Sequence, residues 1–368
     1  MAPCSSIAFT DVLHEVPLLW DFMNAECCQV LLGANTELRK ETHRRVTHIS
    51  SKTGAQPANV SSLVNGGWSQ LQILDLTWSN MTPAATAQLS KGAWPFLRTL
   101  CLARSYLYRS SCDANVFRQF KGKWRLLEHL VITLNRLDSA SVIALADIHW
   151  PHLKTLCIEP SNAAMSALMK KNNWPQLKSL SLGSGLEEDG LVHLGDCPWS
   201  TLEELQLRDC TVTSIVMQHL IVAHFPKLTK ISLVQIELHG VSSCALLAKG
   251  NWPHLTTLEL CLTWAPDLER SFPQALATGY WPHLHTLMLE GLHVTDTNLP
   301  VLLTSSWPAL KSLTLMGRFN STDVLLLCMD KWPALQSLTI ATNTANAAAI
   351  FPLAHSMWPS LQINCKVT

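Results

Sequence analysis

Charged residues are scarce in this chain of 368 residues, and neither sign of charge prevails. Lys plus Arg number 27, as do Asp plus Glu, and charged residues make up only 15% of the sequence. A chain without net charge lacks the broad electrostatic field that captures nucleic acid or anionic membranes, so we expect neither as a partner. Because 48% of the residues are hydrophobic, the composition also excludes extensive disorder.

Three further features are missing. No apolar run approaches the roughly 18 residues of a membrane-spanning helix. The opening MAPCSSIAFT has no basic segment followed by an apolar core, so we expect no secretory signal. The 12 Cys are too few for a disulfide scaffold in a chain of this length. We therefore expect free thiols, a reducing compartment, and a cytoplasmic or nuclear location.

Tryptophan, in contrast, is abundant, and it marks an internal repeat. The chain has 14 Trp, and most of them recur, together with one Phe, at intervals of 24–30 residues. Pro follows the aromatic residue in nine of these twelve units. A fixed period of this length is typical of solenoid proteins. The twelve anchors are Trp68, Trp94, Trp124, Trp150, Trp174, Trp199, Phe225, Trp252, Trp281, Trp307, Trp332 and Trp358.

A strict aliphatic pattern follows each anchor. Leu stands three residues on in all twelve units, and Leu or Ile stands six and eight residues on in eleven of them. A spacing of two places side chains on one face of a strand, so each anchor is predicted to precede a short strand. The exceptions, Asn364 and Lys366, follow Trp358 and indicate that the last unit is a cap.

The spacing upstream of each anchor is that of a helix. Leu or Met stands five residues before the anchor in most units, and another apolar residue often stands eight before it, as at Leu63 and Val60. Offsets of three and four lie on one helical face, and Gly often follows as a cap. Each unit is therefore predicted to be a strand, a turn and a helix of two or three turns.

This pattern resembles that of leucine-rich-repeat proteins, over roughly residues 58–368. The unit length resembles the ribonuclease-inhibitor and cysteine-containing subclasses. The resemblance implies an α/β fold, a right-handed solenoid or horseshoe with a parallel sheet on its concave face and helices on its convex face. We assign residues 56–368 to this solenoid of about twelve units. The family's Asn or Cys eleven residues after the anchor is present at Cys210 but absent at Ile236, where backbone groups need other partners.

Residues 1–55 follow a different pattern, which predicts three short helices. Pro17 opens the first, Gly33 ends the second, and Leu38 and Arg39 lie on the third. Together with Val16-Pro17-Leu18-Leu19 and with Cys28, Val30 and Leu31, they resemble an F-box. That resemblance implies that residues 12–49 bind the adaptor of a cullin-type ubiquitin ligase. The residues that would bury against it are Pro17, Leu18, Leu19 and Leu31. The alternative is a helical cap that covers the apolar end of the first repeat.

Residues five, seven and nine after each anchor are expected on the concave face, and charges gather there in the middle units. Glu204 and Lys230 are expected side by side on neighbouring strands, where they can form an ion pair; the alternative is a mixed-charge surface that binds a partner protein. Trp78 and Trp264 leave the Trp register, and each either anchors a partner or packs into a turn. The candidate partner-binding residues are Glu204, Arg208, Lys230, Glu259, Glu290, Trp78 and Trp264.

The sequence shows no catalytic signature. It contains no G-x-S-x-G, H-E-x-x-H or G-x-x-x-x-G-K-[ST] motif, and Cys27-Cys28 lacks the spacing of a zinc site. We expect no enzyme activity, no metal and no cofactor. The leading hypothesis is a protein-interaction module that serves as the substrate-recognition subunit of a cullin-type ubiquitin ligase. The alternative is a stand-alone scaffold or inhibitor whose N-terminal segment is only a solenoid cap.

Overall fold

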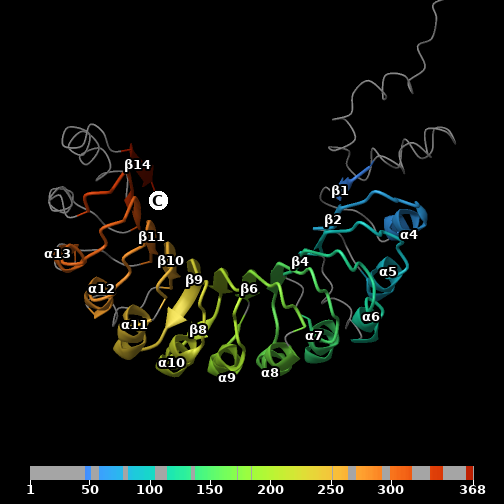
Figure 1. Ribbon diagram of the computed structural model, residues 1–368, viewed down its shortest axis with the longest axis horizontal. Helices are drawn as coiled ribbons and strands as arrows, with labels where there is room; N and C mark the ends of the chain where they lie inside the picture. The colour runs from blue at the N-terminus through green and yellow to red at the C-terminus, as the bar shows by residue number, and fades with distance from the viewer. Residues whose placement is uncertain are drawn as a thin grey trace, which may run out of the picture. The chain divides into compact units, whose positions relative to one another are not determined.

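The protein is described by a computed structural model (Figure 1). Two compact units divide the chain: unit 1 comprises Met1–Pro160 and Lys171–Leu177, and unit 2 comprises Ser161–Lys170 and Lys178–Thr368. The structure describes residues 46–50, 58–77, 82–103, 114–133, 137–171, 173–183, 185–250, 252–263, 271–291, 299–316, 332–342 and 362–367.

Strands and helices alternate along unit 1, as the spacing predicts. Each described strand pairs in parallel with the next one along the chain, and the helices lie to one side of them (Figure 1). The elements are β1 (His48–Ser50), α4 (Ala58–Asn65), β2 (Ile73–Asp75), α5 (Pro83–Leu89), β3 (Thr99–Cys101), α6 (Ala114–Arg118), β4 (His129–Ile132), α7 (Ser139–Ala146) and β5 (Thr155–Ile158).

Unit 2 repeats this arrangement with longer strands. Its main sheet is parallel, in the order β6-β7-β9-β10-β11-β12-β13-β14, and β8 pairs only with β9. The elements are α8 (Asn162–Lys171), β6 (Ser179–Gly183), α9 (Glu188–Leu191), the 3-10 helix η3 (Val192–Asp196), β7 (Glu204–Arg208), β8 (Thr211–Val212), α10 (Ser214–Val222), β9 (Lys230–Leu238), α11 (Val241–Ala248), β10 (Thr257–Leu262), α12 (Ser271–Ala277), β11 (Thr286–Glu290), α13 (Leu299–Leu302), β12 (Ser312–Met316), β13 (Ser337–Thr342) and β14 (Gln362–Val367).

The core forms where the aliphatic pattern predicts it. In the repeat that follows Trp150, the residues at offsets three, six and eight are Leu153, Leu156 and Ile158, and each is at most 1% exposed. The helix positions upstream are buried as well, with Leu145 1% exposed. Strand and helix side chains therefore share one apolar layer, as they do in solenoids whose repeats cannot bury their own faces alone. The predicted fold class, an α/β solenoid of the leucine-rich-repeat type, is confirmed.

Several aromatic anchors stack on the anchor of the next repeat. Trp94 and Trp124 have ring centroids 6.0 Å apart, and Trp307 and Trp332 have the same separation at an interplanar angle of 10°. Trp199 stacks on Phe225 at 6.4 Å, so the Phe ring takes the place of an indole against the preceding anchor. These rings are at most 6% exposed. The anchors thus pack the core, which confirms that their repetition serves stability.

The sheet begins ahead of residue 56. Strand β1 lies inside the segment 1–55, for which the sequence predicts helices, and its Ile49 pairs opposite Leu74 of β2. Val46 is completely buried and Ile49 is 1% exposed. Three residues with one buried aliphatic and no Trp anchor carry too little pattern to predict a strand. The apolar edge of the first anchored repeat is thus covered by a strand.

In the last repeat, the register of the strand differs from the predicted one by one residue. In the pairing of β13 with β14, Leu338 lies opposite Ile363 and Ile340 lies opposite Cys365. The positions predicted for Asn364 and Lys366 are therefore taken by their apolar neighbours, because β14 begins one residue earlier after Trp358. Asn364 and Lys366 lie opposite Thr339 and Ala341 of β13.

In the middle of unit 2, backbone hydrogen bonds between β8 and β9 take the place of the side-chain hydrogen bonds that the family's Asn would make at position 236. Beyond Gln235, whose φ is +55°, β9 continues and pairs with β8, placing Thr211 opposite Glu237. The amide of Glu237 donates to the carbonyl of Cys210, at 3.0 Å. At Ile236, where the family's polar residue is absent, the carbonyl accepts from the amide and hydroxyl of Thr263. Backbone groups in these turns therefore find partners in the next repeat.

Candidate protein-interaction surface

One face of the sheet in unit 2 carries no helix among the described residues, and we call it the strand face (Figure 1). Its side chains alternate with the buried aliphatics, and the burial pattern of β10 and β11 shows this period of two. Ahead of β14, the strand face is therefore built from residues five, seven and nine after the anchor, as predicted. Its rows run from strand to strand, with Glu204 opposite Lys230 and Arg208 opposite Val234.

The predicted charged residues are brought onto this one face, but they differ in exposure. Glu204 and Arg208, at the two ends of β7, are both exposed. Lys230, Glu259 and Glu290, on β9, β10 and β11, are half-buried. The remaining candidates, Trp78 and Trp264, and the adaptor-binding candidates Pro17, Leu18, Leu19 and Leu31 lie outside the described residues.

The predicted ion pair between Glu204 and Lys230 is wrong. The Nζ of Lys230 lies 2.7 Å from Oε1 of Glu259, on the strand at its other side. Glu259 also accepts a hydrogen bond from Ser232, at 2.8 Å, which fixes its carboxylate beside Lys230. Ser232 is 1% exposed, so the hydrogen bond that holds Glu259 is shielded from water. Glu204 lies at an exposed strand end and has no such buried donor.

Serines of β6 hold the side chains of β7. The hydroxyl of Ser179 donates to Oε2 of Glu204, and that of Ser181 donates to Oε1 of Gln206, both at 3.0 Å. Gln206 and these serines are at positions expected on the concave face, but they are not among the predicted partner-binding residues. The signal was their place at outward strand positions, where short hydroxyl side chains next to longer polar ones favour cross-strand hydrogen bonds.

Cys261 and Glu290 form a separate contact on the strand face. Burial, foremost, raises the pKa of the Cys261 thiol to about 12; its hydrogen bond with Glu290 and the charges of Glu290 and Glu259 act in the same direction. This thiol is therefore protonated at neutral pH. A protonated thiol is a poor nucleophile, so the contact is structural rather than reactive.

The outward side chains of unit 1 are smaller and bonded among themselves. The hydroxyl and amide of Thr77 both donate to Oδ1 of Asp75, at 2.5 and 2.9 Å. Nδ1 of His129 lies 3.0 Å from the hydroxyl of Thr155. Along the turns before the strands, Glu128 binds both Arg98 and Lys154, and the Lys154 hydrogen bond is the main cause that lowers the pKa of Glu128. These contacts tie neighbouring repeats together.

The described residues contain neither a candidate metal centre nor a helix able to cross a membrane. No group of three or more His, Cys, Asp or Glu side chains among them has the arrangement of a metal site. No helix among them combines the length and the apolar character that a membrane span requires.

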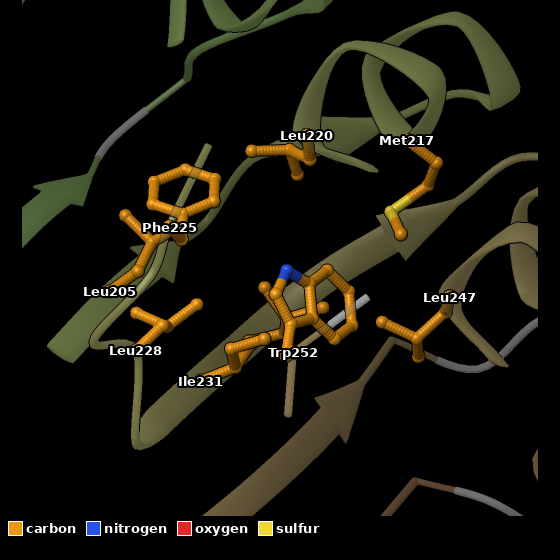
Figure 2. Close-up of a pocket in the computed structure, with 9 residues that line it drawn as sticks. Leu205, Met217, Leu220, Phe225, Leu228, Ile231, Leu247 and Trp252 are labelled. Carbon is orange, nitrogen blue, oxygen red and sulfur yellow. The ribbon is translucent and has the colours of Figure 1, made fainter. Parts of the chain in front are cut away.

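A small apolar cavity lies inside unit 2, beneath the sheet. Its volume is about 10 Å³, roughly the room of one water molecule. Figure 2 shows Phe225, Leu220, Met217 and Trp252 around it. A space this small and this apolar is a packing gap beside the one anchor that is not Trp, and it has no room for a ligand.

Comparisons with known proteins place the fold but not the family. No protein-family model matches the sequence, and no curated protein matches it. Among solved structures, the crystal structure of the yeast Rad7 and Elc1 complex is similar to 96% of this chain and 87% of the matched chain, with 15% identity and a TM-score of 0.56. A protein from Bacteroides fragilis matches 74% of this chain and 66% of its own, with 14% identity and a TM-score of 0.38.

Proposed function

We propose that this chain is a non-enzymatic protein-interaction module, most specifically a substrate-recognition subunit of a cullin-type ubiquitin ligase. The observation that carries the binding role is the strand face of unit 2. It exposes charged groups at both ends of β7, and the parallel sheet fixes their spacing, which lowers the ordering cost of binding. In this proposal the transfer chemistry belongs to other subunits, and the solenoid presents the substrate.

The ligase role rests on the F-box-like segment and on one structural likeness. Pro17, Leu18, Leu19 and Leu31 are the residues that would bury against an adaptor. Rad7, whose structure is similar along 96% of this chain, was solved in a complex with a second protein, Elc1. That likeness supports the proposal that this solenoid also works as part of an assembly.

The experiment is capture of the tagged full chain from cells, read by mass spectrometry. The parental chain is expected to recover a cullin and its adaptor, and the double variant Leu18→Asp/Leu19→Asp is expected to lose both. Val222→Asp is the control for an added carboxylate, because it also replaces an aliphatic residue by Asp, on α10, where the side chain is already 84% exposed. Absence of a cullin and adaptor from the parental capture would reject the ligase role.

The second candidate is a stand-alone scaffold or inhibitor, in which the N-terminal segment only caps the solenoid. One observation favours it: β1, within that segment, pairs with β2 and buries Val46 and Ile49. Thermal unfolding of Leu18→Asp/Leu19→Asp separates the two roles. A cap predicts a lower melting temperature for the variant, whereas an adaptor-binding segment predicts an unchanged one.

A further inference from the structure

The side-chain hydrogen bonds of the strand face form two groups, one joining β6 to β7 and the other joining β9 to β10. The polar side chains of β6 donate to β7, through Ser179 and Ser181. Those of β9 donate to β10, where Lys230 and Ser232 both bind Glu259. Among the described residues no side-chain to side-chain hydrogen bond joins β7 to β9. The outward side chains of β7 are thus held from one side only.

Each of the three outward side chains of β7 keeps a binding group that no other described residue uses. Glu204 accepts from Ser179 through Oε2, which leaves Oε1 available. Gln206 accepts from Ser181 through Oε1, which leaves its amide N–H groups available as donors. Arg208 is exposed, and its guanidinium has no ion-pair partner in the described part of the chain.

The neighbouring strands leave room above β7. At the three outward positions β6 carries Ser179, Ser181 and Gly183, all smaller than the residues that they flank. On the other side, the ammonium of Lys230 is drawn toward Glu259 and away from Glu204. A chain lying along β7 would therefore meet a negative group, an amide donor and a positive group, in that order.

We propose that β7 binds an extended segment of a partner protein that carries a basic residue for Glu204 and an acidic residue for Arg208, four positions apart. Glu204 and Arg208 are four residues apart on one strand, a span of about 13 Å. An extended peptide repeats its side-chain direction every second residue, so its residues i and i+4 match that span on one side. The amide of Gln206 then donates to a carbonyl between them. Arg208 pairs with the carboxylate in the bidentate geometry that guanidinium favours.

This inference rests on the proposed binding role and names the chemistry of the segment that the solenoid recognises. It does not depend on the ligase role, because a scaffold or inhibitor would use the same face. Both charges are exposed, so the interaction is screened by salt. Binding is expected to weaken several-fold between low and high ionic strength.

The test is selection of a phage-displayed random peptide library on the full chain. The parental protein is expected to enrich peptides with a basic and an acidic residue four positions apart, in one order. The charge-swapped variant Glu204→Arg/Arg208→Glu keeps the composition and is expected to enrich the reverse order. A synthetic peptide selected on the parental protein should bind this variant about 10-fold more weakly, because the swap removes two solvent-exposed charge pairs.

The matched control swaps a neighbouring ion pair on the turn before the strands. Lys178→Glu/Glu203→Lys reverses the pair that the two residues form at 2.7 Å, one residue away from Glu204. It should enrich the parental order of charges. No consensus with the parental protein, or a consensus that the β7 swap leaves unchanged, overturns the proposal. Neither result bears on adaptor capture, which depends on residues 17–31.

Discussion

Leu156 shows how strictly single residues are constrained at the centre of a repeat. It lies in the middle of β5, pairs opposite Leu130, and is 1% exposed. Leu156→Asp would bury an unpaired carboxylate among aliphatics and is expected to cost at least about 3 kcal/mol of unfolding free energy. Its neighbour Thr155 faces outward, so Thr155→Asp is expected to change stability by less than about 1 kcal/mol. Cooperative urea unfolding of Leu156→Asp at the parental midpoint would contradict the register.

Phe225 is the one anchor that is not Trp, and the small cavity lies beside it (Figure 2). Phe225→Trp is expected to fill this space and to extend the aromatic column. The expected gain is about 0.5–1 kcal/mol of unfolding free energy, within the range of cavity-filling substitutions. Urea denaturation measures it, and Phe225→Leu, which removes the ring from Trp199, is the control expected to lose stability. A loss with Trp as well would show that the core there cannot accommodate an indole.

The buried thiols make stability depend on pH in the alkaline range. Burial is the main cause that raises the pKa of Cys197 to about 11 and those of Cys210 and Cys244 to about 12, from an ordinary value of 9.0. Between pH 9 and these values the folded chain holds protons that the unfolded chain has released, so stability falls as pH rises. We expect the unfolding free energy to decrease between about pH 9 and pH 11, and to decrease less in Cys244→Ala.

Much of this residue-scale detail was predictable, and the exceptions have physical reasons. Leu156 and its equivalents follow from a spacing of two, since only one face of each strand is buried. The partner of Lys230 does not follow, because Glu204 and Glu259 lie on the strands at its two sides. The choice depends on Ser232, whose buried hydroxyl fixes Glu259. When two possible partners flank a charged side chain, the ion pair that forms depends on residues that contact those partners. Hydrophobic periodicity carries no information about these contacts.

At the scale of elements, the turns after the strands determine how closely the repeats of unit 2 approach. Gly291 has φ +79°, and a Cβ there would lie 1.9 Å from the carbonyl oxygen of Leu262 in the preceding repeat. Gly240 has φ +77°, but a Cβ there would meet nothing within 4 Å. Substitution at Gly240 therefore tests backbone strain alone, whereas substitution at Gly291 tests strain together with a steric clash between repeats.

Gly240→Ala is expected to cost about 2 kcal/mol, because φ +77° with ψ 152° is a backbone conformation that essentially only glycine adopts. Gly291→Ala is expected to cost about 3 kcal/mol, because overpacking against Leu262 adds to that strain. Chemical denaturation of both variants measures the difference. Equal losses would mean that the turn after β11 can move away from β10.

Elements were predicted where the repeat is regular and missed where it changes. The strands after the anchors lie where the aliphatic pattern places them, whereas β1 has no anchor and β14 begins one residue early. The pairing of β8 with β9 was also missed, because it replaces a side-chain ladder with a backbone one. Backbone pairing outside the main strands leaves little trace in hydrophobic periodicity, since its residues are partly exposed.

At the scale of the whole molecule, we propose that two parts of one chain have two different binding functions. The N-terminal segment would hold an adaptor, and β7 in unit 2 would hold the recognised protein. The two proposed sites use different residues, so we expect them to bind their partners independently. Variants of the two sites should therefore have separable effects.

The most direct measurement is quantitative capture of three full-length proteins from the same cells: the parental chain, Leu18→Asp/Leu19→Asp, and Glu204→Arg/Arg208→Glu. The account predicts that the first variant loses the cullin and its adaptor but keeps the other proteins bound to the parental chain. It predicts the reverse for the second variant. If both variants lose the same proteins, or if neither loses any, the chain is not a receptor with an adaptor site and a separate recognition strand.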